Sequence, residues 1–241
     1  MEEYRSRIYS QYELLWPDQK TLFDEEEALR WGRYYLRLLK DFLPKDKNSA
    51  ILELGCGTGR LLYNLKLMGY SEVKGVDLSA EQARIARQTG IDVEQRDVFD
   101  VLSENPETFQ LIIALDFFEH FSKDECLRLL DACRDALQPG GRLVLQTVNA
   151  QSPMGLSCRY ADFTHETCVT PGCLRNLMTL CGFKDYQARE RAPIPYGMVS
   201  FIRFVLWGII RRLIWMYDMV EVTGTTYPIY TRNFIGSAVK K

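Results

Sequence analysis

The sequence predicts an α/β protein built on a doubly wound, mostly parallel β-sheet. First, short apolar strands alternate with helical segments from Ala50 onward, which is the pattern of βαβ units. Second, a glycine loop at residues 55–59 directly follows the first of these strands, where a Rossmann-like sheet leads into its first helix. The length of 241 residues suits one large domain with added elements.

The individual strands and helices follow from local patterns. Five strands are expected at residues 51–54, 73–77, 91–96, 109–115 and 142–148, and two closing strands at 183–189 and 234–240. Ser79 with Gln82 and Ser122 with Glu125 each form a capping-box pattern, which predicts a helix start at each serine. A later helix is expected to begin at Pro171, because proline is favoured at the first helical position.

The chain divides into an arm and a main domain. Residues 1–44 are expected to form a helical N-terminal arm, since apolar residues recur at helical spacing from Glu25 to Phe42 before Pro44 ends the pattern. Residues 45–241 form the main domain. An apolar helical insertion at residues 196–226 lies between the two closing strands.

Composition narrows the classes of function. Hydrophobic residues make up 46% and charged residues 26% of the chain, which is typical of a globular protein. The net charge of −2 argues against a chain-wide electrostatic footprint for nucleic acid. Seven cysteines without a CxxC pair and two histidines predict no metal site, and the N-terminus lacks a signal-peptide pattern, so we expect a cytoplasmic protein with reduced thiols.

The spacing of the glycine loop restricts the ligand. Gly55, Gly57 and Gly59 alternate as G-x-G-x-G, whereas the dinucleotide fingerprint is G-x-G-x-x-G and the phosphate-binding Walker loop needs G-K-[ST]. The loop has no lysine to reach a phosphate, and Arg60 comes only after it. A ligand carboxylate, such as that of S-adenosylmethionine, could use the positive helix end.

Two acidic residues follow successive strands. Asp77 lies 22 residues after Gly55, where a doubly wound sheet places a carboxylate against ribose hydroxyls. Asp97 ends the third strand, where an adenine amino group would lie, although an aspartate that merely solvates a loop fits equally well.

The segments around these residues resemble the successive motifs of class I S-adenosylmethionine-dependent methyltransferases. The segments are residues 53–59, 76–79, 97–98, 116–120 and 137–143, whose order and spacing match throughout. The resemblance implies a seven-stranded sheet with an antiparallel last strand, and S-adenosylmethionine across the strand ends, with S-adenosylhomocysteine as product. Carried over by position, the cofactor-binding residues are Glu53, Gly55, Cys56, Gly57, Gly59, Asp77, Leu78, Asp97, Val98, Leu115, Asp116 and His120. The arm is expected to close over the cofactor through Arg33 or Tyr34.

His165 is the candidate catalytic residue. Methylation of an oxygen often requires removal of a proton, and histidine has a suitable pKa. The stretch Tyr160–Glu166 resembles the Thr-His segment of ubiquinone-biosynthesis O-methyltransferases and of methyltransferases that act on bacterial surface sugars. The alternative is that His165 braces its loop.

Residues 198–220 form an expected amphipathic helix. Its polar residues share one stripe and comprise Ser200, Arg203, Trp207, Arg211 and Asp218. Arginines interrupt the apolar run, so the helix is too polar to span a bilayer. Three interpretations stay open: peripheral membrane contact, burial against the sheet, or a homodimer contact.

The sequence therefore predicts an enzyme that methylates a hydroxyl of a small-molecule or sugar-containing acceptor, including one joined to a lipid. No Asn-Pro-Pro-Tyr element follows the fourth strand, which disfavours methylation of amino groups on nucleic-acid bases or glutamine. The alternatives are a nicotinamide-dependent oxidoreductase, which needs an extra residue in the glycine loop, and a non-catalytic module that binds S-adenosylmethionine at a membrane.

Overall fold

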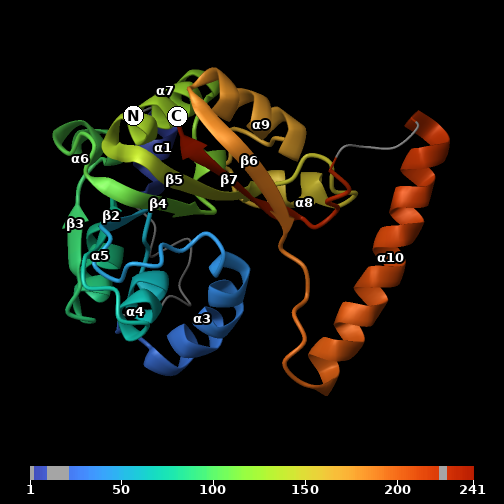
Figure 1. Ribbon diagram of the computed structural model, residues 1–241, viewed down its shortest axis with the longest axis horizontal. Helices are drawn as coiled ribbons and strands as arrows, with labels where there is room; N and C mark the ends of the chain where they lie inside the picture. Colours follow the sequence, from blue (N-terminus) through green and yellow to red (C-terminus); the bar gives the residue numbers. More distant parts are fainter. Residues whose placement is uncertain (1–2, 10–21, 223–226) are drawn as a thin grey trace.

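The computed structural model describes residues 3–9, 22–222 and 227–241, so part of the predicted arm and residues 223–226 of the insertion lie outside the described residues. A seven-stranded sheet forms the centre of the molecule (Figure 1). Its strands are β1 (Ile51–Leu54), β2 (Val73–Asp77), β3 (Asp92–Gln95), β4 (Phe109–Leu115), β5 (Leu137–Val148), β6 (Phe183–Glu190) and β7 (Asn233–Lys240).

The strand order is β3-β2-β1-β4-β5-β7-β6. Strand β1 pairs in parallel with both β2 and β4, and β4 pairs in parallel with β5. Strand β7 lies antiparallel between β5 and β6. The predicted fold class, a mostly parallel doubly wound sheet with an antiparallel last strand, is confirmed. The order reverses between β1 and β4, where such sheets open a ligand crevice.

Strand β5 begins at Leu137, five residues earlier than its predicted start at Arg142. Leu137 pairs with Phe109, and the register then shifts before Leu111 pairs with Arg142. The Pro-Gly-Gly turn that interrupts the sequence pattern is accommodated as an irregularity within the strand.

Helices cover both faces of the sheet (Figure 1). One face carries α3 (Glu25–Leu39), α4 (Arg60–Leu67) and α5 (Ala80–Arg87), and the other α6 (Val98–Glu104), α7 (Lys123–Ala136) and α9 (Pro171–Leu180). Successive residues of a strand alternate between the faces, so Ile51 joins the core under α3 to α5 while Leu52 joins the core under α6, α7 and α9. The short elements are α1 (Glu3–Tyr9), η1 (Phe118–His120) and α8 (Gly155–Arg159).

The arm helix α3 packs closely on α4. Asn64 of α4 is buried and donates its side-chain amide to the Ala28 carbonyl of α3 at 2.8 Å and to the Arg60 carbonyl at 2.8 Å. A Cβ atom on Gly32 would lie 2.0 Å from Asn64 Oδ1, so only glycine allows this approach. The close contact fixes α3 over the carboxyl ends of β1 and β4.

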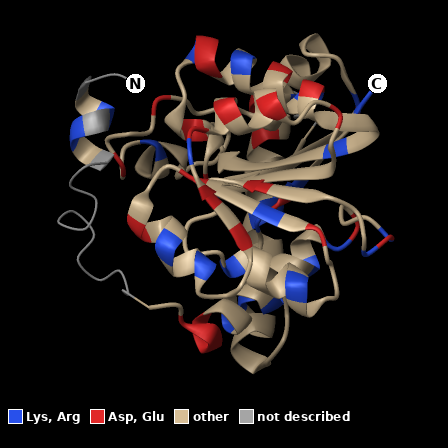
Figure 2. Cartoon of the chain, turned by 90° about the vertical axis from the view of Figure 1, so that its left-hand side faces the viewer, with Lys and Arg blue, Asp and Glu red and all other residues tan. Residues whose placement is uncertain are grey.

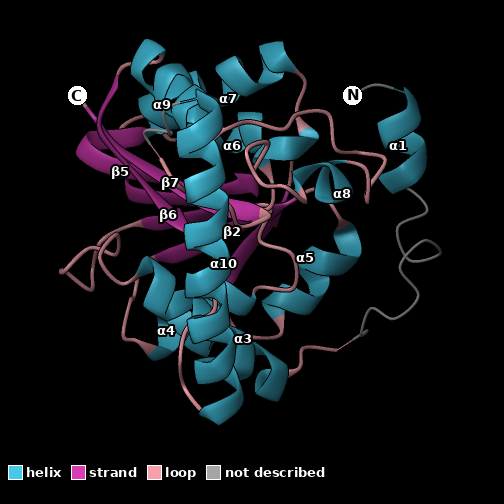
Figure 3. Cartoon of the chain, turned by 90° about the vertical axis from the view of Figure 1, so that its right-hand side faces the viewer, coloured by secondary structure: helices cyan, strands magenta, loops and turns pink. Residues whose placement is uncertain are grey.

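Helix α10 (Met198–Val222) stands apart from the layers (Figures 1 and 3). None of its 25 residues is buried by the part of the chain that the structure describes. Within the same described residues, no helix is both long enough and apolar enough to cross a membrane.

The α3–α4 contact yields a stability prediction. Gly32→Ala should lower the free energy of unfolding by about 1–3 kcal/mol, because the added methyl must displace the hydrogen-bonded Asn64 amide. Gly208→Ala in α10, where a Cβ meets nothing within 4 Å, is the matched control and should be neutral or stabilising by up to about 1 kcal/mol. Urea-induced unfolding measures both, and equal stability of the two variants would contradict the account.

Candidate active site

The glycine loop makes a tight turn from β1 into α4. Gly55, Gly57 and Gly59 have φ angles of 62°, 53° and 79°, in the left-handed region that side chains disfavour. A Cβ on Gly55 would lie 2.4 Å from the Phe117 ring, so the loop also runs close to the segment after β4. The turn presents backbone rather than side chains at the carboxyl end of β1.

A cavity of about 440 Å³ opens beside this loop, within the usual range for small-molecule sites. It lies between the loop, the end of β4 and the start of α3. Its lining residues are Leu22, Phe23, Asp24, Glu27, Trp31, Tyr35, Glu53, Gly55, Cys56, Gly57, Thr58, Arg60, Leu61, Gln82, Leu115 and Asp116. The structure therefore brings six of the predicted cofactor residues together: Glu53, Gly55, Cys56, Gly57, Leu115 and Asp116.

The charge of the cavity is negative. Among the described lining residues, Asp24, Glu27, Glu53 and Asp116 are acidic, and Arg60 supplies the opposite charge. Arg60 pairs with Glu27 at 2.8 Å, which leaves its charge largely balanced. Such a cavity favours a cationic ligand over a diphosphate, because like charges repel strongly in a partly desolvated site.

Glu53 is the most constrained of these carboxylates. It is 4% exposed, and its Oε2 atom has no hydrogen-bond partner among the described residues. Burial, and then the nearby Asp77, raise the pKa of Glu53 well above its usual range. An ammonium group in the cavity would satisfy this oxygen and stabilise its charge, so the residues present fit the methionine end of S-adenosylmethionine.

Asp77 ties the glycine loop to the end of β2. Its two carboxylate oxygens accept hydrogen bonds from the Gly57 and Ser79 N–H groups, each at 2.8 Å. Burial raises the pKa of Asp77, while these two hydrogen bonds act in the opposite direction. A carboxylate oxygen can accept more than one hydrogen bond, so Asp77 keeps capacity for ligand hydroxyls.

Asp116 closes the far side of the cavity in an unusual backbone conformation. Its φ angle is +52°, a region that aspartate tolerates better than most residues. Its carboxylate accepts hydrogen bonds from Gln146 Nε2 at 2.7 Å and from Asn233 Nδ2 at 2.6 Å. Gln146 also donates to the Tyr35 hydroxyl at 3.1 Å, so β5 links the β4 end to the arm helix.

The other predicted cofactor residues lie outside the lining set. Gly59 caps α4 beside Ala86, Leu78 is exposed, and Val98 is buried in the core. Asp97 caps α6 by accepting from the Phe99 N–H group at 2.9 Å. Their contacts with a cofactor, and that of Asp77, stay predictions.

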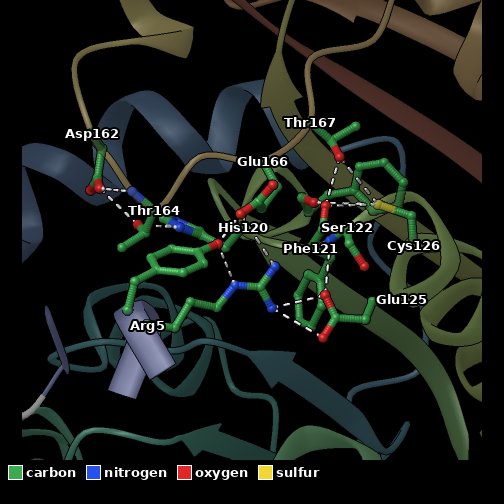
Figure 4. Close-up of polar contacts among 12 residues, drawn as sticks. Arg5, His120, Phe121, Ser122, Glu125, Cys126, Asp162, Thr164, Glu166 and Thr167 are labelled. Carbon is green, nitrogen blue, oxygen red and sulfur yellow. Dashed lines mark hydrogen bonds and ion pairs between the residues drawn. The ribbon is translucent and has the colours of Figure 1, made fainter. Parts of the chain in front are cut away.

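The two histidines face each other beyond the cavity. Their ring centroids are 4.8 Å apart, and His120 Nδ1 lies 2.9 Å from the Thr164 hydroxyl (Figure 4). Burial, and then the neighbouring His165, lower the pKa of His120 to about 4, so this ring is neutral near physiological pH. His165 Nδ1 lies 2.9 Å from the Cys158 carbonyl oxygen, which can only accept, so Nδ1 donates a proton to it, and Nε2 makes no hydrogen bond with the described residues. Neither histidine lines the cavity of the glycine loop.

Helix α1 braces the loop that carries His165. Arg5 is 4% exposed and donates to both carboxylate oxygens of Glu125, at 3.0 and 2.8 Å (Figure 4). The Tyr4 hydroxyl donates to Glu166, the residue after His165. Glu125 in turn accepts from the Ser122 N–H group at 2.8 Å, as its capping-box pattern predicts.

The arm reaches the cavity through residues that the sequence did not single out for this role. Tyr35 and Trp31 line the cavity and stack with ring centroids 3.9 Å apart. Tyr34 instead donates to the Ala192 carbonyl at 2.9 Å, and Arg33 is exposed, so the expectation that one of these two reaches the cofactor is not supported by this geometry. The sequence feature that could have indicated this role is the spacing of Trp31 and Tyr35, because residues four apart on a helix lie on the same side.

Glu119 supplies a pH prediction. It is 1% exposed, and burial, followed by Asp116, raises its pKa from 4.5 to about 8. At intermediate pH the folded chain thus holds a proton on Glu119 that the unfolded chain has released. The contribution of this proton to the free energy of unfolding is complete below about pH 4.5 and is lost as the pH rises through about 8.

In Glu119→Gln this fall in the free energy of unfolding should largely disappear, while the exposed Glu72→Gln should retain it. Urea titrations across this pH range give the measurement. A pH profile shared by the two variants would show that Glu119 does not carry the effect.

Comparison with known proteins agrees with this geometry. A family model described as a methyltransferase domain matches residues 23–188. A ubiquinone biosynthesis O-methyltransferase of Xylella fastidiosa is 35% identical over 107 residues, which is 42% of this chain and 42% of that protein. The chain thus matches less than half the length of this curated relative.

Solved structures share the fold. A SAM-dependent methyltransferase from Archaeoglobus fulgidus is 20% identical, with a TM-score of 0.65 over 87% of this chain and 94% of that one. A Haemonchus contortus phosphoethanolamine N-methyltransferase 2, solved with S-adenosylhomocysteine, is 18% identical, with a TM-score of 0.59 over 87% of this chain and 52% of that one. With its glycine loop, acidic cavity and family match over residues 23–188, this chain belongs to the S-adenosylmethionine-dependent methyltransferase family.

Proposed function

We propose that this methyltransferase transfers the methyl group to a hydroxyl of a small-molecule or sugar-containing acceptor, including one joined to a lipid. The observation that carries the proposal is the placement of His165, whose Nδ1 donates to the Cys158 carbonyl, which leaves Nε2 as the nitrogen that would accept a proton from the acceptor. Hydroxyl acceptors need such a base when they are methylated. The O-methyltransferase name of the Xylella relative supports the same chemistry.

The glycine-loop end would hold S-adenosylmethionine, which supplies a methyl group on a positively charged sulfur. Asp77 would accept from its ribose hydroxyls, and the free Glu53 Oε2 would accept from its ammonium group. The ring faces of Trp31 and Tyr35 would cover it and exclude water. Asp116 accepts from Gln146 and Asn233, so its side chain would keep a fixed position at the wall of the site.

The loop of residues 160–166 would form the acceptor end. There His165 Nε2 would take the hydroxyl proton of the acceptor, and the bound cofactor would supply the methyl group to the acceptor oxygen and leave as S-adenosylhomocysteine. Helix α1 would set the position of His165 through the contacts of Tyr4 and Arg5 with Glu166 and Glu125.

The cofactor end is tested by Asp77→Asn, which removes the negative charge that would accept from ribose hydroxyls. S-adenosylmethionine affinity should fall by roughly 10- to 100-fold, the usual worth of hydrogen bonds to a charged group. Asp92→Asn, at an exposed ion pair 3.3 Å from Lys74, is the matched control and should bind normally. Calorimetric titration measures both, and unchanged affinity in Asp77→Asn would remove Asp77 from the site.

The acceptor end is tested by two His165 variants. His165→Ala should lower turnover by roughly 10²-fold with little change in S-adenosylmethionine affinity, because it removes the base. His165→Asn keeps an amide donor for the Cys158 carbonyl but has no basic nitrogen, so it should be equally slow. Turnover is followed as S-adenosylhomocysteine release with phenolic and sugar hydroxyl acceptors.

Near-normal turnover in His165→Asn alone would show that His165 only braces its loop. Release of S-adenosylhomocysteine with amine acceptors but with no hydroxyl acceptor would overturn the proposed O-methylation. Tight binding of S-adenosylmethionine without release of S-adenosylhomocysteine in the presence of any acceptor would favour a non-catalytic binding module.

A further inference from the structure

Helix α10 turns its polar stripe toward the protein. Its four least exposed non-glycine residues are Ser200, Trp207, Ile214 and Asp218, which recur at steps of seven, seven and four and so share one side of the helix. Trp207 Nε1 and Arg211 both contact the Glu190 carboxylate, at 3.3 and 3.2 Å. This orientation is the reverse of an ordinary surface helix, whose apolar side faces the core.

The opposite side of α10 is apolar and uncovered by the described residues. We define the outward face as Met198, Val199, Ile202, Val205, Leu206, Ile209, Leu213, Met216 and Val220, each between 44% and 86% exposed. Arg212 is the charged residue on this side. The helix has 25 residues and is about 37 Å long. The outward face therefore forms one continuous apolar surface, unlike the single exposed apolar side chains that are normal on a protein.

The breadth of this surface argues for a lipid bilayer rather than a second helix. Pairing with another copy buries a narrow seam of about two residues in every seven. Between Phe201 and Trp207, however, five of the seven residues are apolar and exposed: Phe201, Ile202, Phe204, Val205 and Leu206. A helix that lies in the boundary of a bilayer is surrounded by lipid on its whole outward side, which matches this distribution.

The charged and aromatic residues of α10 fit an anionic surface. Arg212, on the outward side, has no carboxylate within 4.0 Å among the described residues, so its charge is available for lipid phosphates. Arg203, on the polar stripe, instead lines a cavity of about 240 Å³ with Arg191 and Tyr34 at the start of α10. Trp215 and Tyr217 are 45% and 63% exposed, and such rings favour the membrane boundary.

The position of α10 places this face on the side of the active site. Glu190, which anchors Trp207 and Arg211, is the last residue of β6, a strand parallel to β1 and β4. Figure 3 shows α10 crossing in front of the edge of the sheet to which the parallel strands run. On the other side of the molecule, Lys, Arg, Asp and Glu recur along the helices (Figure 2).

We propose that the outward face of α10 docks the enzyme on the surface of an anionic lipid bilayer. The polar stripe holds the helix to the protein through Glu190, the apolar side enters the boundary region, and Arg212 contacts lipid phosphates. If the proposed function holds, docking also turns the acceptor end toward the membrane, where a lipid-joined hydroxyl is met.

Flotation of the full chain with vesicles tests the docking. Wild-type protein should float with vesicles made of roughly equal parts phosphatidylcholine and phosphatidylglycerol. The double variant Ile209→Asp/Leu213→Asp should lose at least about tenfold in vesicle partitioning, because it places charges in the centre of the outward face. Leu67→Asp on α4, at a leucine 58% exposed, is the matched control and should float normally.

A second variant tests the charge contribution. Arg212→Gln should weaken partitioning about fivefold on the anionic vesicles and little on pure phosphatidylcholine, since each surface arginine contributes through the lipid charge. Circular dichroism and S-adenosylmethionine affinity confirm that each variant is folded.

Two outcomes would overturn the proposal. One is a wild-type chain that fails to float, or a double variant that floats equally well. The other is a dimer in light scattering that the double variant abolishes while neither protein binds vesicles, which would assign the face to a second copy. Turnover with a water-soluble acceptor in vesicle-free buffer is read separately, so failure of docking is distinguishable from failure of the proposed methyl transfer.

Discussion

The hydrogen bond from the Gly57 N–H group to the Asp77 carboxylate is the contact on which the rest of the site depends. It joins the loop after β1 to the end of β2, and Ser79 holds the same carboxylate from the other side. The left-handed conformation of Gly57 aims its N–H group at Asp77. With the loop fixed, Glu53 is buried behind it, and its Oε2 atom has no hydrogen-bond partner among the described residues.

Charge then decides which ligand this cavity suits. Four lining carboxylates outweigh one arginine that is already paired, so a diphosphate would meet repulsion where a sulfonium and an ammonium group would meet attraction. The nicotinamide alternative therefore fails on electrostatics as well as on glycine spacing. The proposed acceptor end differs in character, because His165 and His120 contact a carbonyl and a hydroxyl there rather than carboxylates.

Local patterns in the sequence predicted the strands, the glycine loop and the capped helices, because these depend on neighbouring residues. They did not predict the roles of Trp31, Tyr35 and Gln146, which meet the site only through packing between α3, β4 and β5. The sequence predicted the polar stripe of α10 but not the direction in which it points. The stripe faces the protein because Trp207 donates to Glu190 and Asp218 accepts from Tyr230, and both partners lie outside the helix. The orientation of α10 is thus a tertiary property that periodicity alone does not contain.

The most direct measurement of the central claim is a calorimetric titration of the wild-type chain with S-adenosylmethionine and, in parallel, with a nicotinamide dinucleotide. Saturable one-to-one binding of S-adenosylmethionine and no binding of the dinucleotide are expected, because the acidic cavity and alternate-glycine loop match the sulfonium cofactor. Binding of the dinucleotide instead, or no binding of S-adenosylmethionine to a folded chain, would contradict the account.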